Sequence, residues 1–441
     1  MKLVVVGGGS TYTPELVDGI ARLGEGSLAG SSIGSATLPV SELVLVDPDE
    51  LRLDRVGGLS RRIMSAYGHP ATVRGTTDLD DGLEGAGAVL LQLRVGGQAA
   101  RHRDETWPLT CGCVGQETTG AGGFAKALRT VPLVLNIAER ARKLAEPGAW
   151  IVDFTNPVGI VTRALLDAGH RAVGLCNVAI GFQRRIAAHL GVSPDRISLG
   201  HVGLNHLTWE REVFLDGTDV LPQVLDSFGD ELADSLGLPV NVIRRLGVIP
   251  SYYLRYYYAH DLVVEQQRTE PTRAEVVAGY EKELLDMYAD PALNHKPELL
   301  AKRGGAFYSE AAVALLASLT ADTGDTQVVN LRNNGTLPFL SDDAVIEVPA
   351  RIGAAGPVAL PIAPVEPLYA GLIAHVTAYE ELALDAALRG GRDRVFQTML
   401  AHPLIGQIDI ADRLTDRLIA ENQAYLGWAV GEMSPSWVHT P

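Results

Sequence analysis

The chain has 441 residues, of which 46% are hydrophobic and 20% are charged, and its formal net charge is −16. A chain of this length and apolar content can bury a large core, and we expect two domains or one large bilobal unit. The acidic balance, without any basic run, argues against a nucleic-acid partner, because phosphate backbones are bound by clustered lysine and arginine. No apolar stretch reaches the length of a membrane span, no secretory cleavage pattern follows Met1, and three cysteines do not make a disulfide framework. We therefore expect a cytoplasmic protein with no membrane partner.

The chain opens with a strand that runs into a glycine turn. The apolar run over residues 3–6 predicts a parallel strand that is covered on both faces. Three consecutive glycines then let the backbone turn tightly and approach a phosphate, and Pro14 suits the first turn of a helix whose free N–H groups face the anion. Tyr12 stands where a complete G-x-G-x-x-G pattern has its third glycine, so the pattern alone is weak. The residues expected to hold a dinucleotide here are Gly7, Gly8, Gly9, Ser10 and Thr11.

A second apolar strand over residues 41–47 strengthens this prediction. It ends in Asp47, where the ribose hydroxyls of a bound nucleotide should lie. A carboxylate accepts hydrogen bonds from a free 2′-hydroxyl and repels a 2′-phosphate, so Asp47 favours NAD over NADP. The spacing from the glycines is long because residues 24–35 form a glycine- and serine-rich stretch, which we interpret as a surface insertion.

Apolar strands alternate with helical stretches through the first two hundred residues. Further strands are predicted over residues 88–93, 150–154 and 172–176. Such alternation is typical of right-handed βαβ units, so the predicted fold class is α/β, with a Rossmann-type doubly wound parallel sheet over residues 1–197. Asn156 and the pair Cys176-Asn177 follow two of these strands, at the edge of the sheet where ligands of such folds bind.

The pattern changes from about residue 198. A longer strand is predicted over residues 206–214, another over 344–349, and helices over roughly 366–418. We therefore predict a second, helix-rich α+β domain over residues 198–441, which gives an architecture like that of lactate and malate dehydrogenases, with substrate, metal and oligomer contacts in this second domain.

Cys176 and His206 are candidate metal ligands. A thiolate and an imidazole that converge on the cofactor cleft could hold a divalent transition ion with open positions for substrate oxygens. Either residue alone is more often structural, since isolated cysteines and histidines usually pack in cores.

The surrounding motifs resemble those of glycoside hydrolase family four, the NAD- and metal-dependent glycosidases, and most closely its 6-phospho-β-glucosidases. The similarity spans nearly the whole chain, and the order and spacing of the motifs are specific. The matching segments are residues 7–10 with 13–14, 94–97, 115–120 continuing to 122–125, 155–157, 176–177, 203–206, 250 with 253–257, and 272–275.

The resemblance implies a mechanism without the usual pair of carboxylates. Family members oxidise the sugar 3-hydroxyl with NAD, remove the acidified C2 proton, eliminate the aglycone from C1, add water and return the hydride. The metal, manganese in much of the family, acts as a Lewis acid at the 2- and 3-oxygens.

The resemblance also assigns roles to individual residues. Cys176 and His206 match the metal ligands, and Tyr253 matches the base, which needs a neighbouring cation because a free tyrosine has a pKa of about 10. Arg94 and Arg273 match arginines that contact the substrate, for which bidentate guanidinium geometry is suited. The remaining substrate contacts are Asn156 and Asn177; phospho-α-glucosidases carry an aspartate at the latter position, and phospho-β-glucosidases an asparagine.

We therefore expect a 6-phospho-β-glucosidase that binds NAD, a divalent metal such as Mn²⁺ and a small phosphorylated sugar, and that forms a homodimer or homotetramer. One rival is an NAD-dependent 2-hydroxy-acid dehydrogenase, which would use a histidine base and no metal. A family-four glycosidase of other sugar specificity is a second rival. A nucleotide-sensing module would need only the first domain.

The chain departs from the family pattern at two places. Ala179 stands where a proline is common, and Cys111 and Cys113 are atypical ahead of the 115–120 motif. Arg303 and Glu270 are lower-ranked site candidates.

Overall fold

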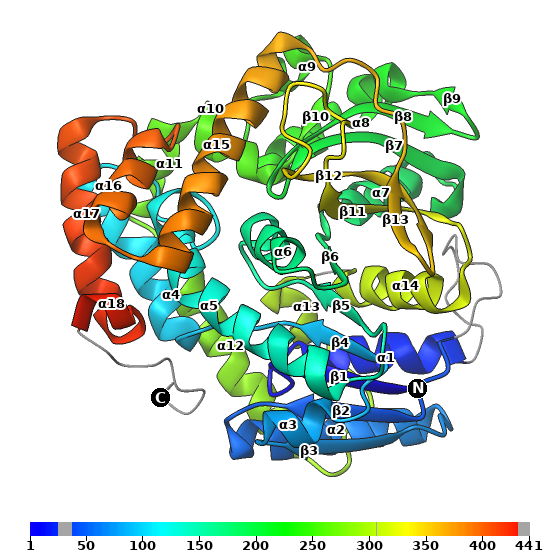
Figure 1. Cartoon of the computed structure of the whole chain (residues 1–441). Helices are drawn as coiled ribbons and strands as arrows, with labels where there is room; N and C mark the ends of the chain where they lie inside the picture. The colour runs from blue at the N-terminus through cyan, green and yellow to red at the C-terminus, as the bar shows by residue number, and fades with distance from the viewer. Residues whose placement is uncertain (25–37, 306, 431–441) are drawn as a thin grey trace.

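The computed structural model describes residues 1–24, 38–305 and 307–430, and the chain path is shown in Figure 1. Most of the predicted insertion at residues 24–35 lies outside the described residues. All three cysteines are free. Within the part of the chain that is described, no helix combines the length and the apolar character needed to cross a membrane.

The first half of the chain forms a parallel sheet with helices on its faces. The strands run in the spatial order β3-β2-β1-β4-β5-β6, as in doubly wound dinucleotide folds. Apolar runs without alternation build them because both faces are covered; Leu3 to Val6, for example, are fully buried. The strands are β1 (Lys2–Val6), β2 (Glu42–Val46), β3 (Thr72–Thr76), β4 (Ala88–Leu91), β5 (Trp150–Asp153) and β6 (Ala172–Gly174). The predicted Rossmann-type sheet is confirmed.

The sheet continues into strands from the second half of the chain. β11 pairs antiparallel with β6 through Asn330 and Gly174, and the order then runs β12-β7-β8-β10, so thirteen described strands share one sheet. These strands are β7 (Ile197–Leu204), β8 (Leu207–Leu215), β9 (Thr218–Asp219), β10 (Ile249–Pro250), β11 (Thr326–Arg332), β12 (Val345–Gly353) and β13 (Gly356–Ala359). The division of the chain at residue 197 stays a prediction.

Helices surround both parts of the sheet, and in Figure 1 the C-terminal helices lie beside α4 and α5. The helices of the first half are α1 (Thr13–Gly24), α2 (Glu50–Ala66), α3 (Leu79–Leu83), α4 (Gly97–Thr106), η1 (Trp107–Cys111), α5 (Gly120–Leu144), α6 (Val158–Asp167), α7 (Val178–Leu190) and η2 (Pro194–Arg196). Those of the second half are α8 (Leu221–Leu236), α9 (Val240–Leu246), η3 (Tyr252–Leu254), α10 (Arg255–Tyr258), α11 (His260–Gln267), α12 (Arg273–Tyr288), α13 (Leu299–Arg303), α14 (Tyr308–Ala321), α15 (Pro367–Arg389), α16 (Arg392–Ala401), α17 (Ile408–Asn422), η4 (Gln423–Tyr425) and α18 (Gly427–Val430).

The strand predicted over residues 206–214 begins one residue later, at Leu207. His206 lies in the tight connection between β7 and β8 and has a φ of 64°, a left-handed conformation that a strand residue does not adopt. The turn therefore places His206 outside the hydrogen-bonded pairing of β7 with β8, at the end of this hairpin.

A buried ion network connects the strands of this hairpin with β12. His201 Nδ1 lies 2.7 Å from Glu210 Oε1, and its Nε2 lies 3.1 Å from Glu347 Oε1. The other oxygen of Glu347 accepts hydrogen bonds from the side-chain amides of Asn205 and Asn330 at 3.1 and 2.8 Å. Burial disfavours the charged imidazole, but the two carboxylates outweigh it and raise the pKa of His201 to about 10. The histidine is thus a buried cation between two acids.

We predict that replacing His201 with glutamine lowers the free energy of unfolding by about 3–5 kcal/mol at neutral pH, because two buried carboxylates lose their shared counter-charge. The pKa rises from 6.5 in the unfolded chain to about 10 in the fold. The stabilisation is therefore complete below pH 6.5 and is lost as the pH rises through about 10. Urea titrations of wild type and variant between pH 6 and 10 measure it.

Replacing the exposed His295, whose ring hydrogen-bonds the neighbouring Asn294, with glutamine is the matched control, and it should leave the unfolding curves unchanged. Equal stability of the His201→Gln variant and wild type at neutral pH would contradict this account of the network.

Candidate active site

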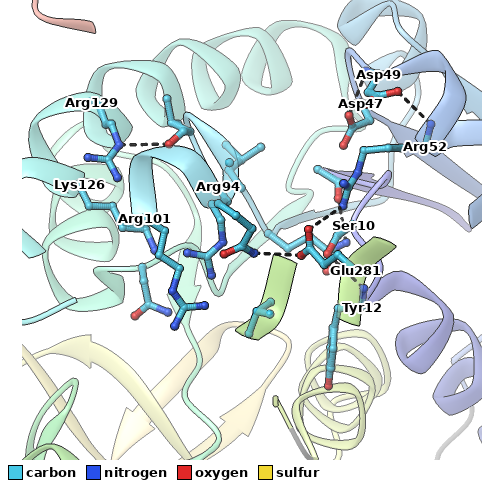
Figure 2. A pocket seen from close by; sticks show the side chains of 18 of the residues that line it. Ser10, Tyr12, Asp47, Asp49, Arg52, Arg94, Arg101, Lys126, Arg129 and Glu281 are labelled. Carbon is cyan, nitrogen blue, oxygen red and sulfur yellow. Dashed lines mark hydrogen bonds and ion pairs between the residues drawn. The ribbon is translucent and has the colours of Figure 1, made fainter. Parts of the chain in front are cut away.

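A cleft of about 1550 Å³ opens at the carboxyl ends of the parallel strands. It is large enough for a dinucleotide together with a sugar. Among its described lining residues seven are basic and four are acidic, although the chain as a whole is strongly acidic. The basic residues are Arg52, Arg94, Arg101, Lys126, Arg129, Arg273 and Arg303, and Figure 2 shows five of them around the cleft. This local excess of positive charge suits a ligand that carries phosphates.

The glycine turn occupies one end of the cleft. The N–H groups of Gly7 and Gly8 both donate to the carbonyl oxygen of Val46 at 2.9 Å, which holds the turn against the neighbouring strand. A Cβ atom at Gly7, which has a φ of 87°, would lie 2.7 Å from the carbonyl oxygen of Gln92, so a larger residue does not fit. Tyr12, in place of a third glycine, is buried and donates its hydroxyl proton to the carbonyl oxygen of Gly305 at 2.6 Å. The turn is thereby attached to the second half of the chain.

Asp47 lies beside this turn, as the sequence predicted in spite of the long spacing. Its Oδ2 accepts the N–H of Gly9 at 3.0 Å, and its Oδ1 accepts the N–H of Asp49 at 3.1 Å. Burial raises the pKa of this carboxyl, and the two backbone donors oppose the rise. A Cβ atom at Gly9 would lie 2.7 Å from the Asp47 carboxyl carbon. The third glycine of the run is therefore required by the approach of this carboxylate.

A buried carboxylate, Glu117, gathers three of the cations of the cleft. Lys126 Nζ donates to its Oε2 at 2.7 Å, Arg101 Nε lies 3.2 Å from its Oε1, and Arg94 also forms an ion pair with it. Burial opposes ionisation, but the three cations hold the pKa of Glu117 well below its usual range. Burial also disfavours the charged form of the Lys126 ammonium and lowers its pKa to about 8. Arg94, a predicted substrate ligand, is thus oriented by an acid that the sequence analysis had not singled out.

Arg303 and Arg273 connect α12 and α13 with the glycine turn. Arg303 Nε donates to the hydroxyl of Thr11 at 2.7 Å, and its Nη2 lies 3.4 Å from Ser10 Oγ and 3.1 Å from Glu281 Oε1. Arg273 donates to the carbonyl oxygens of Lys302 and Arg303 at 2.8 and 3.0 Å. The predicted cofactor turn and the predicted substrate arginine therefore share one hydrogen-bonded framework.

The predicted base, Tyr253, also lines the cleft, whereas the predicted metal ligands Cys176 and His206 lie next to it and are not among the described lining residues. The ring of Tyr253 stacks on that of His206, with centroids 3.6 Å apart and planes 9° from parallel. Burial lowers the pKa of His206 to about 4, so its imidazole is neutral. Burial raises the pKa of Cys176 well above its usual value, as does the charge of Glu347, and the hydroxyl of Tyr308 hydrogen-bonds its thiol. Burial raises the pKa of Tyr253 well above its usual value, and the nearby Cys176 raises it and Arg101 lowers it, so both groups lie close to its hydroxyl.

The donor set at Cys176 and His206 fits a transition ion. A thiolate and a neutral imidazole are suitable ligands, and a bound cation deprotonates the thiol. Among the described residues no group of three or more histidine, cysteine, aspartate or glutamate side chains forms a metal site. Two protein ligands leave coordination positions for substrate oxygens.

Asn156 lines the cleft, and its buried side-chain oxygen has no hydrogen-bond partner within the described parts of the chain. A buried acceptor of this kind is costly to leave unpaired, so it suits a hydroxyl group of a ligand. Asn177 follows Cys176 directly and is the residue before α7. Both predicted asparagines therefore lie at carboxyl ends of the parallel strands.

The sequence analysis missed several residues of the cleft. Lys126 could have been noticed as a lone charge within the apolar segment 124–128, and Glu117 as the acid of the quoted 115–120 motif. The cleft residues Gln423, Ala424, Tyr425 and Gly427 carry no recognisable signal. They reach the cleft because α17 packs against α5 and because Asn422 accepts a hydrogen bond from Arg129 at 3.0 Å.

Comparison with known proteins identifies the class of protein. The model described as Family 4 glycosyl hydrolase matches residues 2–192, and that of the Family 4 glycosyl hydrolase C-terminal domain matches residues 201–405. The chain belongs to glycoside hydrolase family 4 and is an enzyme of the glycosidase class.

The individual relatives are phosphoglucosidases. The chain is 40% identical to the probable 6-phospho-beta-glucosidase of Bacillus subtilis (strain 168), over 97% of each chain. It is 34% identical to the 6-phospho-beta-glucosidase of Escherichia coli (strain K12), over 97% of this chain and 96% of the other.

A solved structure of the Thermotoga maritima 6-phospho-beta glucosidase with manganese, NAD⁺ and glucose-6-phosphate superposes with a TM-score of 0.89 at 33% identity, covering 97% of this chain and 99% of that one. A malate dehydrogenase from Salinibacter ruber, at 17% identity and a TM-score of 0.53, shares the fold.

We predict that Glu117→Gln destabilises the protein by about 3–5 kcal/mol, because Arg94 and Lys126 then lose their buried counter-charge. Thermal and urea unfolding of the variant measure the loss. The control is Glu139→Gln, which removes a partly exposed carboxylate paired with Lys143 at 3.5 Å on the outer face of α5 and should change stability little. Unchanged stability of Glu117→Gln would show that the cations do not depend on this acid.

Proposed function

We propose that this enzyme hydrolyses 6-phospho-β-glucosides, such as phosphorylated disaccharides or aryl glucosides, with NAD and a divalent metal, Mn²⁺ foremost. The observation that carries the proposal is the placement of Tyr253: its ring stacks on His206, beside Cys176, in a cleft whose far end is the glycine turn. The predicted base thus lines the same cleft as the glycine turn and stacks on one of the two predicted metal ligands, an arrangement that the family mechanism requires.

The glycine turn supports the cofactor part of the proposal. Gly7, Gly8 and Gly9 bring the backbone close to where the pyrophosphate would lie, with Ser10 and Thr11 at the start of the helix that follows. The Asp47 carboxylate beside Gly9 is suited to the ribose hydroxyls of NAD.

Cys176 and His206 would hold the metal, through the thiolate and the neutral imidazole. When bound, NAD supplies a hydride acceptor for the sugar 3-hydroxyl and the metal supplies a Lewis acid for the 2- and 3-oxygens, so that the C2 proton becomes acidic.

The side chains of the cleft position the sugar phosphate. Arg94 and Arg273 would bind the 6-phosphate or the sugar oxygens, Asn156 would accept a hydrogen bond from a sugar hydroxyl, and Asn177 lies where phospho-α-glucosidases have an acid. An amide at that position agrees with a β-linked substrate.

Tyr253 would remove the C2 proton through its phenolate oxygen. Burial raises the pKa of this tyrosine well above its usual value, whereas the neighbouring Arg101 lowers it. Proton removal at C2 then allows the aglycone to leave from C1 by elimination. Arg101, itself oriented by Glu105 at 2.7 Å, is the cation of this chain that favours the phenolate.

We further propose that the enzyme is a homodimer or homotetramer. Several large apolar side chains are exposed on separate helices of the described surface, where contacts with further copies of the chain would bury them. They include Leu262, Ile408 and Leu368, with exposed fractions of 72%, 67% and 60%.

Tyr253→Phe tests the base. The substitution keeps the stacked ring and removes only the hydroxyl, so the fold should persist while turnover of an aryl 6-phospho-β-glucoside falls by about 10²–10⁴-fold. In D₂O the wild-type product should carry deuterium at C2, which mass spectrometry of the sugar phosphate detects. Full activity of Tyr253→Phe with retained C2 labelling would assign the role to another residue, with Tyr256 or Tyr257 next.

Metal binding is tested separately. His206→Ala or Cys176→Ser should abolish Mn²⁺ binding and activity while NAD binding, followed by fluorescence titration, stays close to wild type, because the glycine turn lies at the other end of the cleft. Wild-type turnover rates after thorough chelation would refute the metal assignment.

A further inference from the structure

Thr118 contacts the imidazole of His206 at the Nδ1 atom of the ring. Its Oγ1 lies 3.0 Å from His206 Nδ1. Thr118 belongs to the loop 115–120, which leads into α5, so two segments far apart in the sequence meet at this hydrogen bond. If Nδ1 donates to Thr118, the lone pair of a neutral His206 ring is free at Nε2. If Thr118 donates, Nδ1 is the acceptor and Nε2 carries the proton.

The side chain of Gln116 settles the direction. Its Oε1 accepts the backbone N–H groups of both Thr118 and Thr119, the second at 3.0 Å. Only an oxygen can accept from two N–H groups, so the orientation of this amide is fixed. The same oxygen lies 2.8 Å from Thr118 Oγ1. Since an amide oxygen has no proton to give, the threonine hydroxyl must donate to it.

The hydroxyl has a single proton, which Gln116 takes. Thr118 Oγ1 can therefore only accept from His206, so Nδ1 carries a proton. In a neutral imidazole the other nitrogen, Nε2, then has a free lone pair. The ring cannot rotate freely, because Tyr253 stacks on it with the planes 9° apart.

We propose that Thr118 is a positioning residue that fixes the Nδ1–H tautomer of His206 and so presents Nε2 to a divalent transition-metal ion. The proposal rests on the proposed function, in which His206 is a ligand. Outer groups that accept the second N–H of a ligating histidine fix the ring and its basicity, and their loss typically weakens metal binding about 10–100-fold.

The test uses full-length enzyme with NAD and titrates Mn²⁺ alone, with free Mn²⁺ read by electron paramagnetic resonance. Thr118→Val keeps the shape and removes the acceptor, and it should weaken Mn²⁺ binding about 10–100-fold. Thr118→Ser restores a hydroxyl and should bind within about twofold of wild type. Thr119→Val is the matched control, since only the backbone of Thr119 takes part in this network, and its affinity should match wild type.

Wild-type affinity in Thr118→Val, with binding lost in His206→Ala, would overturn this inference and leave the proposed metal site intact. Wild-type affinity in His206→Ala would overturn both. A second measurement needs no variant: long-range ¹H–¹⁵N spectra of metal-free enzyme labelled at histidine should show His206 protonated at Nδ1. Protonation at Nε2 would overturn the proposal even if Thr118→Val failed to fold.

Discussion

The site depends on one buried carboxylate. Glu117 pairs with Arg94, Arg101 and Lys126, and the same short loop carries Gln116 and Thr118 on either side of it. Three like charges can be kept together in a buried cleft only if an acid compensates part of their repulsion, and the remaining excess positive charge is what a phosphorylated ligand requires. The ion pairs of Glu117 thus fix the predicted substrate arginine and the loop that contacts His206.

The backbone of this loop is packed too closely for other side chains. A Cβ atom at Gly115 would lie 1.9 Å from the carbonyl oxygen of Glu105, and one at Gly122 would lie 2.4 Å from that of Asp104. The glycines let α4 and the start of α5 approach backbone to backbone, and this approach brings Lys126 and Arg101 to the same acid. The dense glycine pattern is therefore a packing requirement of the charge cluster as well as part of the family motif.

Much of the fold could be predicted because parallel strands covered on both faces leave apolar runs in the sequence, as at β1 and β2. Asp47 was predicted at the end of the second strand, and it lies there beside the glycine turn, because its position depends on sheet geometry and not on loop length; its role toward NAD stays a prediction. The continuity of the sheet was not predictable, since β6 and β11 meet at a single residue pair, Asn330 with Gly174. The roles of Cys176, His206 and Tyr253 were predicted from the family resemblance. The tautomer of His206 could not be predicted, because it depends on hydrogen bonds between loops that no local sequence pattern encodes.

We propose that a scaffold shared with dehydrogenases performs hydrolysis by removing a hydride from the sugar and returning it. The most direct measurement is the absorbance of NADH during turnover of an aryl 6-phospho-β-glucoside by enzyme from which bound nucleotide has been stripped. Hydrolysis should require added NAD and Mn²⁺, and no NADH should accumulate while product forms. NADH that grows in proportion to product, or full hydrolysis without any NAD, would contradict it.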